Sequence, residues 1–119
     1  MMAMQDSRMI LGGLTLDKVR AQAHLRGRAV KLTRTEFLLL WTLAVKAGTV
    51  AKRDELLNQV WGAEVFVEPR TVDEHIAKLR KKLRAHPGGH SWIETVRRLG
   101  YRLKKPRASS ASGLNPRSR

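Results

Sequence analysis

The sequence predicts an α+β domain with a small antiparallel sheet at the N-terminus, three helices in the middle and a β-hairpin near the C-terminus. Strand-like runs separated by turns occupy residues 9–32, helical patterns follow over about 33–84, and strand-forming residues flank a turn within 92–103. A chain of 119 residues is long enough for one domain with a real core and too short for two.

Turn residues divide the N-terminal region into short strands. Gly12-Gly13 breaks a first run over Met9–Leu16, and a second run over Val19–Leu25 alternates apolar and polar residues. Arg26-Gly27 forms a turn before a third run over Ala29–Leu32. This pattern indicates an antiparallel sheet with one buried face.

A capping box begins the first helix, because Thr33 is followed three residues later by Glu36 and then by an apolar run. The helix ends at Gly48 and is too apolar to lie on a surface, so we expect it to be the core helix. A second helix is predicted over about 52–61. Its predicted inward side chains are Leu56, Leu57, Val60 and Trp61.

A third helix is predicted over 70–84, ending before the helix-breaking sequence 86–89, with Thr71 and Glu74 as a second capping box. The hairpin turns at Arg97-Arg98-Leu99-Gly100. Because the chain beyond Pro106 has almost nothing to bury, we expect residues 105–119 to be a disordered basic tail. We expect residues 1–8 to be a flexible N-terminus, which leaves 9–104 as the domain.

The charge of the chain is strongly positive and unevenly distributed. The sequence has 24 Lys and Arg against 10 Asp and Glu, a net charge of +14. Residues 33–69 carry a net charge of −1, whereas residues 70–105 carry 11 basic and 3 acidic side chains, a net charge of +8. A domain this basic favours a polyanionic partner, nucleic acid before an anionic membrane. The stretch after residue 70 is therefore the expected contact surface.

The third helix has two different faces. On a helical wheel Val72, Ile76, Leu79 and Leu83 form one narrow apolar stripe. The opposite face is basic, with Ala77 as a small residue on it, and a helix of this kind suits the major groove of DNA. Glu74 can accept a hydrogen bond from cytosine N4 or serve only as a helix-capping carboxylate, and the sequence favours neither. The polar residues on or beside the outer face are Arg70, Thr71, Asp73, Glu74, His75, Lys78, Arg80, Lys81 and Lys82.

The hairpin adds a second candidate contact. Thr95 and Arg97 lie on the approach to its turn and Arg98 lies at the tip. An arginine on a hairpin beside a groove-bound helix can enter the adjacent minor groove, where narrow A·T segments attract cations. The alternative is a basic amphipathic helix next to an ordinary charged hairpin.

Other classes of protein fit the sequence less well. Zero cysteines exclude disulfides, thiolate zinc sites and thiol catalysis, and His24, His75, His86 and His90 have no carboxylate at catalytic or metal-ligand spacing. We therefore predict no enzyme, no cofactor and no metal. The longest strongly apolar run, Phe37 to Trp41, is far too short to span a membrane, and no export signal is evident, so we expect no membrane partner and a cytoplasmic location.

Two alternatives to specific DNA binding remain. A non-specific nucleic-acid-binding protein, for RNA or the chromosome, has the same charge, although few aromatic residues are left over for base stacking. A protein-interaction module without a DNA role does not account for the charge of +8 on residues 70–105.

The chain resembles the OmpR/PhoB-type winged-helix effector domain of bacterial two-component response regulators over about residues 9–104. Each motif is weak alone, but their order and spacing together are specific. The motifs are Leu32-Thr33-x-x-Glu36-Phe37-x-Leu39-Leu40, Gly48-x-Val50, Arg53-x-x-Leu56-Leu57-x-x-Val60-Trp61-Gly62, Arg70-Thr71-Val72-Asp73-x-His75-Ile76-x-x-Leu79-Arg80-x-Lys82-Leu83 and Ile93-x-Thr95-Val96-Arg97-x-x-Gly100-Tyr101.

This resemblance implies a winged helix-turn-helix that binds specific double-stranded DNA and controls transcription, with the third helix as recognition helix and the hairpin as wing. By position, Glu74 and Lys78 match base-facing sites. Positions that contact the phosphate backbone or lie beside it match Arg70, Thr71, His75, Arg80 and Trp61, and wing contacts match Thr95, Arg97 and Tyr101.

Family members usually bind direct-repeat DNA as pairs, and the loop between the second and third helices often contacts RNA polymerase. In this chain that loop runs from Gly62 to Pro69. Its apolar residues Val65, Phe66 and Val67 are candidates for that contact, although packing one or two of them against the domain is the more common use of such residues.

The sequence departs from the family in four respects. Lys52 stands where a Ser or Thr usually caps the second helix, a loss of about 1 kcal/mol, which Asp54 and Glu55 partly offset through the helix dipole. Arg98 replaces a wing glycine, and Glu74 occupies an often apolar position. The chain also has no room for the usual N-terminal receiver domain, which fits both a fragment and a free-standing effector domain.

Overall fold

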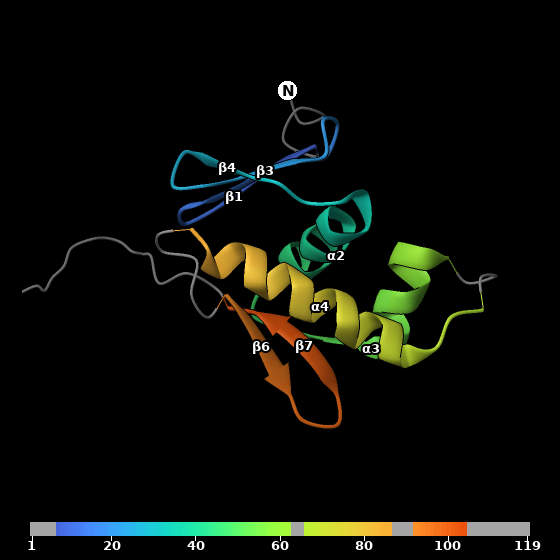
Figure 1. Cartoon of the computed structure of the whole chain (residues 1–119). Coiled ribbons are helices and arrows are strands. Elements are labelled where there is room, and N and C mark those ends of the chain that lie inside the picture. Colours follow the sequence, from blue (N-terminus) through green and yellow to red (C-terminus); the bar gives the residue numbers. More distant parts are fainter. Residues whose placement is uncertain (1–6, 63–65, 87–91, 105–119) are drawn as a thin grey trace, which may run out of the picture.

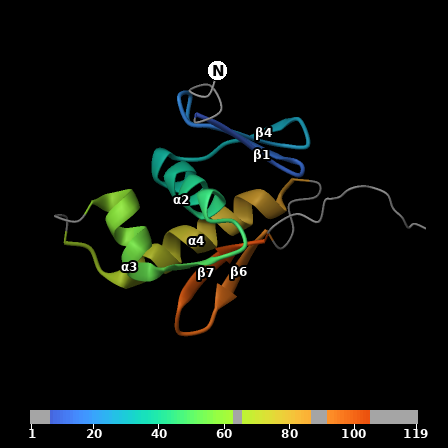
Figure 2. The ribbon, with the colours of Figure 1, turned by 180° about the vertical axis from the view of Figure 1, so that it is seen from behind.

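The computed structural model describes residues 7–62, 66–86 and 92–104. Within them, β1-β2-β3-β4 form one antiparallel sheet and β5-β7-β6 form another. The two sheets lie on opposite sides of the helices (Figures 1 and 2). The elements are β1 (Arg8–Leu11), β2 (Leu14–Asp17), β3 (Gln22–Leu25), β4 (Arg28–Val30), α2 (Arg34–Val45), β5 (Val50–Lys52), α3 (Arg53–Leu56), the π-helical turn η1 (Leu57–Trp61), α4 (Pro69–Arg84), β6 (Ile93–Val96) and β7 (Gly100–Leu103).

The N-terminal sheet buries one face, as the alternation predicts. Leu14 pairs with Leu25, and Leu16 pairs with Ala23, and all four are buried against the helices. The predicted strand over Val19–Leu25 is too long, because residues 18–21 form a turn in which Val19 is 80% exposed. β1 begins at Arg8, which pairs with Asp17, one residue before the expected start of the domain.

Helix α2 is the core helix that the sequence predicts. Its capping box is present, because the Glu36 backbone N–H donates to Thr33 Oγ1 at 3.1 Å and the Thr33 N–H donates to Glu36 Oε1 at 2.9 Å. Phe37, Leu39 and Leu40 are buried within it. This helix packs directly against α4, so the N-terminal half of the domain supports the helix that carries the basic face.

The predicted second helix is divided in two. A single α-helical turn, α3, passes into η1, and Leu56 is fully buried whereas Leu57, Val60 and Trp61 are partly buried against the core. Lys52 makes no capping hydrogen bond with its side chain, as expected, but its backbone N–H donates to Glu55 Oε1 at 2.8 Å. Glu55 in the acidic first turn therefore makes one of the two hydrogen bonds of a capping box, and the bond that a Ser or Thr side chain would make is missing.

The second sheet contains β5, a strand that the sequence analysis did not predict. β5 pairs with β7 in antiparallel register, with Lys52 opposite Gly100. A Cβ atom at Gly100 would overlap the Ala51 carbonyl oxygen and lie 2.9 Å from Lys52 Cα, so only glycine permits this approach of the strands.

Helix α4 begins earlier than predicted. Its first residue is Pro69, whose fixed φ suits the first helical position, and its N-cap is Glu68, which makes no capping hydrogen bond with its side chain. The second capping box predicted for Thr71 and Glu74 is therefore wrong, since both residues lie inside the helix. The helix still ends at Arg84, where it was expected to end.

Candidate nucleic-acid interface

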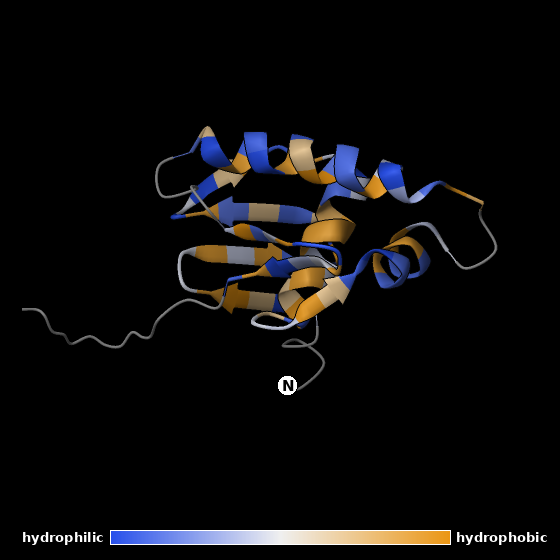
Figure 3. Cartoon of the chain, turned by 90° about the horizontal axis from the view of Figure 1, so that it is seen from below, coloured by the Kyte–Doolittle hydropathy of each residue, from blue (hydrophilic) through white to orange (hydrophobic). Residues whose placement is uncertain are grey.

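The two faces of α4 are separated as the helical wheel predicts. Val72, Ile76, Leu79 and Leu83 are buried. The hydrophilic residues face away from the rest of the molecule (Figure 3). Exposed on that outer side are Arg70, Glu74, Ala77, Lys78 and Lys81. None of the four charged side chains in this group forms a hydrogen bond or an ion pair with a described residue, so they are available to a ligand.

The hairpin β6–β7 carries exposed cations at its turn. Arg97 and Arg98 are exposed, and the turn closes with a hydrogen bond from the Leu99 N–H to the Val96 carbonyl at 3.0 Å. Arg98 has φ +69°, in the left-handed region that favours glycine. The replacement of the family's wing glycine by arginine thus adds a cation at the cost of backbone strain.

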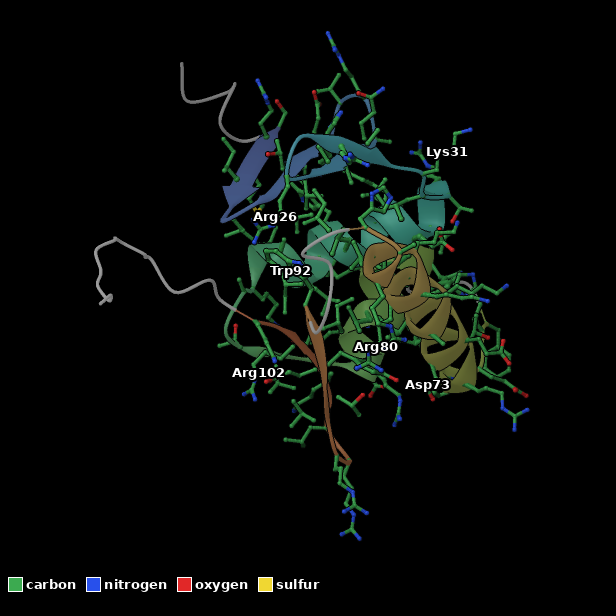
Figure 4. All side chains as sticks on the ribbon, turned by 60° about the vertical axis from the view of Figure 1, so that its left-hand side comes forward. Arg26, Lys31, Asp73, Arg80, Trp92 and Arg102 are labelled. Atoms are coloured by element: carbon green, nitrogen blue, oxygen red, sulfur yellow. The ribbon has the colours of Figure 1, made fainter. Side chains whose placement is uncertain are left out.

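Arg80 joins α4 to the hairpin. Its Nη2 donates hydrogen bonds to the Ile93 carbonyl at 3.0 Å and to Thr95 Oγ1 at 2.7 Å. Its Nε donates a further hydrogen bond to the Ile93 carbonyl at 3.2 Å. The guanidinium lies 5.5 Å from the centre of the Tyr101 ring. Figure 4 shows Arg80 between α4 and the hairpin, with Arg102 on the other side of the hairpin.

Asp73 connects three elements. Its Oδ1 accepts hydrogen bonds from Arg53 Nε of α3 at 2.9 Å and from the Tyr101 hydroxyl of β7 at 2.5 Å. Tyr101, expected to contact DNA, is buried and donates its hydroxyl to this carboxylate. The sequence pattern predicts only that Asp73 is a polar residue of the helix, and the signal that could have identified its role is an acidic side chain in so basic a helix.

The ionisation of this cluster is set by its hydrogen bonds. Burial on its own raises the pKa of Asp73, but the hydrogen bonds from Tyr101 and Arg53 outweigh it and hold the pKa below its ordinary value. Burial, followed by the nearby Asp73, raises the pKa of Tyr101, and the hydrogen bond to Asp73 raises the pKa of Arg53. At neutral pH the cluster therefore holds a carboxylate, a guanidinium and a neutral phenol.

Lys82 is engaged in an internal ion pair. Its Nζ lies 2.6 Å from Oε1 of Glu36, a side chain that is 2% exposed at the start of α2. Burial on its own raises the pKa of Glu36. The hydrogen bonds from Lys82 and the Thr33 backbone lower it by more, so the pKa lies below its ordinary value. The structure thus places this candidate contact in the link between α2 and α4.

Trp61 and His75 lie against each other beside the start of α4. Their ring centres are 5.2 Å apart at an interplanar angle of 80°, an edge-to-face contact. His75 Nδ1 donates to the Thr71 carbonyl at 2.9 Å within the helix. The structure thus brings Trp61, Thr71 and His75 together at one edge of the outer face. All three side chains are partly exposed.

The loop before α4 presents one large apolar side chain to solvent. Phe66 has an exposure of 104%, whereas Val67 is partly buried. Val65, the third candidate for a polymerase contact, lies outside the described residues. Among the described residues no group of His, Asp and Glu could hold a metal ion. No helix within the described ranges is long and apolar enough to cross a membrane.

A basic helix packed on a helix-turn-helix core, with a cationic hairpin at its side, defines the winged-helix class of nucleic-acid-binding domains. The family model "Transcriptional regulatory protein, C terminal" matches residues 27–103. The chain belongs to this family, the OmpR/PhoB-type effector domains, which are DNA-binding regulator domains and not enzymes.

Individual relatives agree with this assignment. The chain is 46% identical over 99 residues to the transcriptional regulatory protein VxrB of Vibrio cholerae serotype O1, covering 83% of this chain and 38% of VxrB. It is 44% identical over 92 residues to the phosphate regulon transcriptional regulatory protein PhoB of Escherichia coli, covering 76% of this chain and 39% of PhoB. The chain thus spans about two fifths of the length of these relatives.

A solved structure supports the fold. The DNA-binding domain of RstA from Klebsiella pneumoniae, in complex with the RstA box, is 38% identical and superposes with a TM-score of 0.71. The match covers 82% of this chain and 96% of that one. The winged-helix architecture predicted from the sequence is therefore confirmed.

Proposed function

We propose that this domain binds specific double-stranded DNA and thereby controls transcription. The observation that carries the proposal is the outer face of α4, where Arg70, Lys78 and Lys81 are exposed and have no described partner, beside a hairpin with two exposed arginines. One α-helix fits the major groove of B-DNA, and long cations on it reach guanine acceptors and phosphates. The RstA structure with its DNA box supports this reading by similarity.

Different residues have different proposed roles. Lys78 and Glu74, near the middle of the exposed face, read base edges, whereas Arg70 and Lys81 bind phosphates. Trp61, Thr71 and His75 lie beside the phosphate backbone at one edge. Arg97 enters the adjacent minor groove, and Arg98 adds charge at the tip of the wing. Because its target is the chromosome, we place the domain in the cytoplasm.

The test is selection from a random duplex library, followed by measurement of affinity for the enriched site at several salt concentrations. Enrichment of a half-site repeated at about one helical turn supports specific binding by a pair of subunits. Absence of any enriched sequence, with a steep dependence of affinity on salt for every duplex, contradicts specific binding and favours a non-specific nucleic-acid-binding protein. Competition with single-stranded RNA separates the duplex from the RNA alternative.

The minor-groove role of Arg97 has its own expected outcome. Arg97→Ala should lose more affinity on a site with A·T-rich flanks than on the same site with G·C-rich flanks, because the narrow A·T groove concentrates negative potential. Fluorescence anisotropy with the two labelled duplexes measures the difference. Equal losses on both duplexes would exclude this placement of Arg97.

Two protein partners follow from the same proposal. The exposed Phe66 is the candidate contact for RNA polymerase, together with Val65 and Val67, and a second copy of the domain is the candidate neighbour on repeated DNA. Because the chain covers 38% of VxrB and 39% of PhoB, we also propose that it works as the effector part of a two-component response regulator. Transcription in vitro with Phe66→Ser tests the first contact, since DNA binding should persist while activation falls.

A further inference from the structure

Arg80 differs from the other cations of α4 in what it touches. Its guanidinium donates to Ile93 and Thr95 of β6 and lies over the ring of Tyr101 of β7. Lys78 and Lys81, on either side of it in the sequence, have no described partner. By resemblance, Arg80 matches a position that contacts the phosphate backbone of DNA or lies beside it. In the structure its guanidinium instead bonds to other residues of the domain.

The partners of Arg80 are themselves fixed. Tyr101 donates to Asp73, which also accepts from Arg53, so α3, α4 and β7 meet at one carboxylate. Thr95 precedes by one residue the Val96 carbonyl that closes the wing turn. Arg80 thus holds the strand that leads directly into the turn carrying Arg97 and Arg98.

We infer that Arg80 is a positioning residue that fixes the wing against the recognition helix, so that both reach DNA as one preorganised unit. Holding the hairpin in place before binding removes the entropy cost of ordering it in the complex. The planar guanidinium of arginine suits this role, because its N–H donors are held in one fixed plane and reach both acceptors while the group lies over the Tyr101 ring. The compact ammonium of lysine, on its flexible stem, lacks this fixed geometry. The inference rests on the proposed function.

The decisive substitution is Arg80→Lys, which keeps the positive charge but not the fork. We expect it to weaken binding to the selected site by about tenfold, close to the effect of losing one groove contact, and to abolish the preference for A·T-rich flanks. In a background of Arg97→Ala it should cause almost no further loss, because the wing contact is already absent. Lys81→Met is the matched control; it should reduce the salt slope by about one and leave the flank preference unchanged.

A measurement without DNA separates this inference from the proposed function. Hydrogen exchange of the Leu99 amide, which bonds to the Val96 carbonyl, should be at least about tenfold faster in Arg80→Lys than in the unaltered chain or in Lys81→Met. Urea unfolding curves establish that each variant is folded under the assay conditions. Unchanged exchange, or losses for Arg80→Lys and Arg97→Ala that multiply, would overturn the positioning role. An unaltered chain without sequence preference would overturn the proposed function instead, whatever the exchange rates.

Discussion

At the scale of single residues, the cations on and beside the outer face of α4 are not equivalent. Lys78 is exposed near the middle of the outer face, whereas Lys82 pairs with Glu36 and Arg80 bonds to β6. The helical wheel assigns all three to the outer face or its edges, since it records direction but not partners. A count of basic residues therefore overstates the charge that is available to DNA.

Lys78→Ala should cost about 1–3 kcal/mol of binding free energy on the selected site and relax specificity at one base pair. The reason is that a base contact is lost only where the matching base is present. Affinities for a set of single-base variants of the site provide the measurement, with Lys81→Ala as control. A uniform loss across all variants would make Lys78 a phosphate contact.

Arg98→Gly should stabilise the fold while weakening DNA binding. Relief of the left-handed conformation contributes about 1–2 kcal/mol, and the greater freedom of glycine in the unfolded chain removes part of it, leaving a gain below about 1 kcal/mol. Urea unfolding and duplex affinity measure the two effects. Arg98→Ala serves as control because it removes the charge but keeps the strain. Equal stability of the Gly and Ala variants would refute the strain argument.

At the scale of elements, the wing depends on a strand far from it in the sequence. β5 precedes α3, yet it pairs with β7 and places Lys52 opposite Gly100. The hairpin is therefore part of a three-stranded sheet rather than an isolated ribbon, and an isolated two-stranded hairpin is only marginally stable in water. This pairing joins the base of the wing to the strand that precedes α3.

Gly100→Ala should destabilise the domain by more than about 2 kcal/mol, because the added methyl group meets the backbone of Ala51 and Lys52, which cannot move aside without breaking the pairing. Thermal unfolding measures the loss. Gly27→Ala is the matched comparison, since Gly27 has φ +83° and open space around its Cβ position, so only backbone strain of about 1–2 kcal/mol applies. Equal losses for both variants would show that the close approach contributes nothing.

At the scale of the whole molecule, two carboxylates, the buried Glu36 and the partly exposed Asp73, link the layers. Glu36 links α2 to α4, and Asp73 links α3, α4 and β7. Both keep a pKa below the ordinary value. In a chain with a net charge of +14, each of these negative charges also offsets repulsion among the cations.

The stability of the domain should fall in acid. A carboxyl whose pKa is lowered by folding stabilises the fold above its ordinary pKa, here 4.5 for Glu36 and 3.8 for Asp73, and that stabilisation is lost as the pH falls through the lower folded value. Urea unfolding from pH 7 to pH 3 measures this. Glu36→Gln, which keeps a capping-box side chain, should lower the free energy of unfolding by about 1–3 kcal/mol at pH 7 and should make that free energy fall less steeply in acid. If the free energy of unfolding of this variant falls as steeply in acid as that of the unaltered chain, Glu36 does not contribute to the fall.

The local pattern of the sequence was sufficient for most of the fold. The alternation within residues 9–32, the capping box at Thr33 and the apolar stripe of α4 each depend on neighbours within a few residues, and each predicts the element that the structure shows. The outer face of α4 could be listed for the same reason, because helical geometry alone decides which side chains share a face.

Which of those side chains are free depends on contacts between distant parts of the chain. The pairing of β5 with β7, the ion pair of Lys82 with Glu36 and the bonds of Arg80 to β6 join residues 13 to more than 40 positions apart. No periodicity within a segment encodes such contacts, since they depend on how the layers pack. Local sequence patterns were therefore enough to predict the class of domain and its basic helix, whereas the packing fixed which cations are exposed and which bond to other residues of the domain.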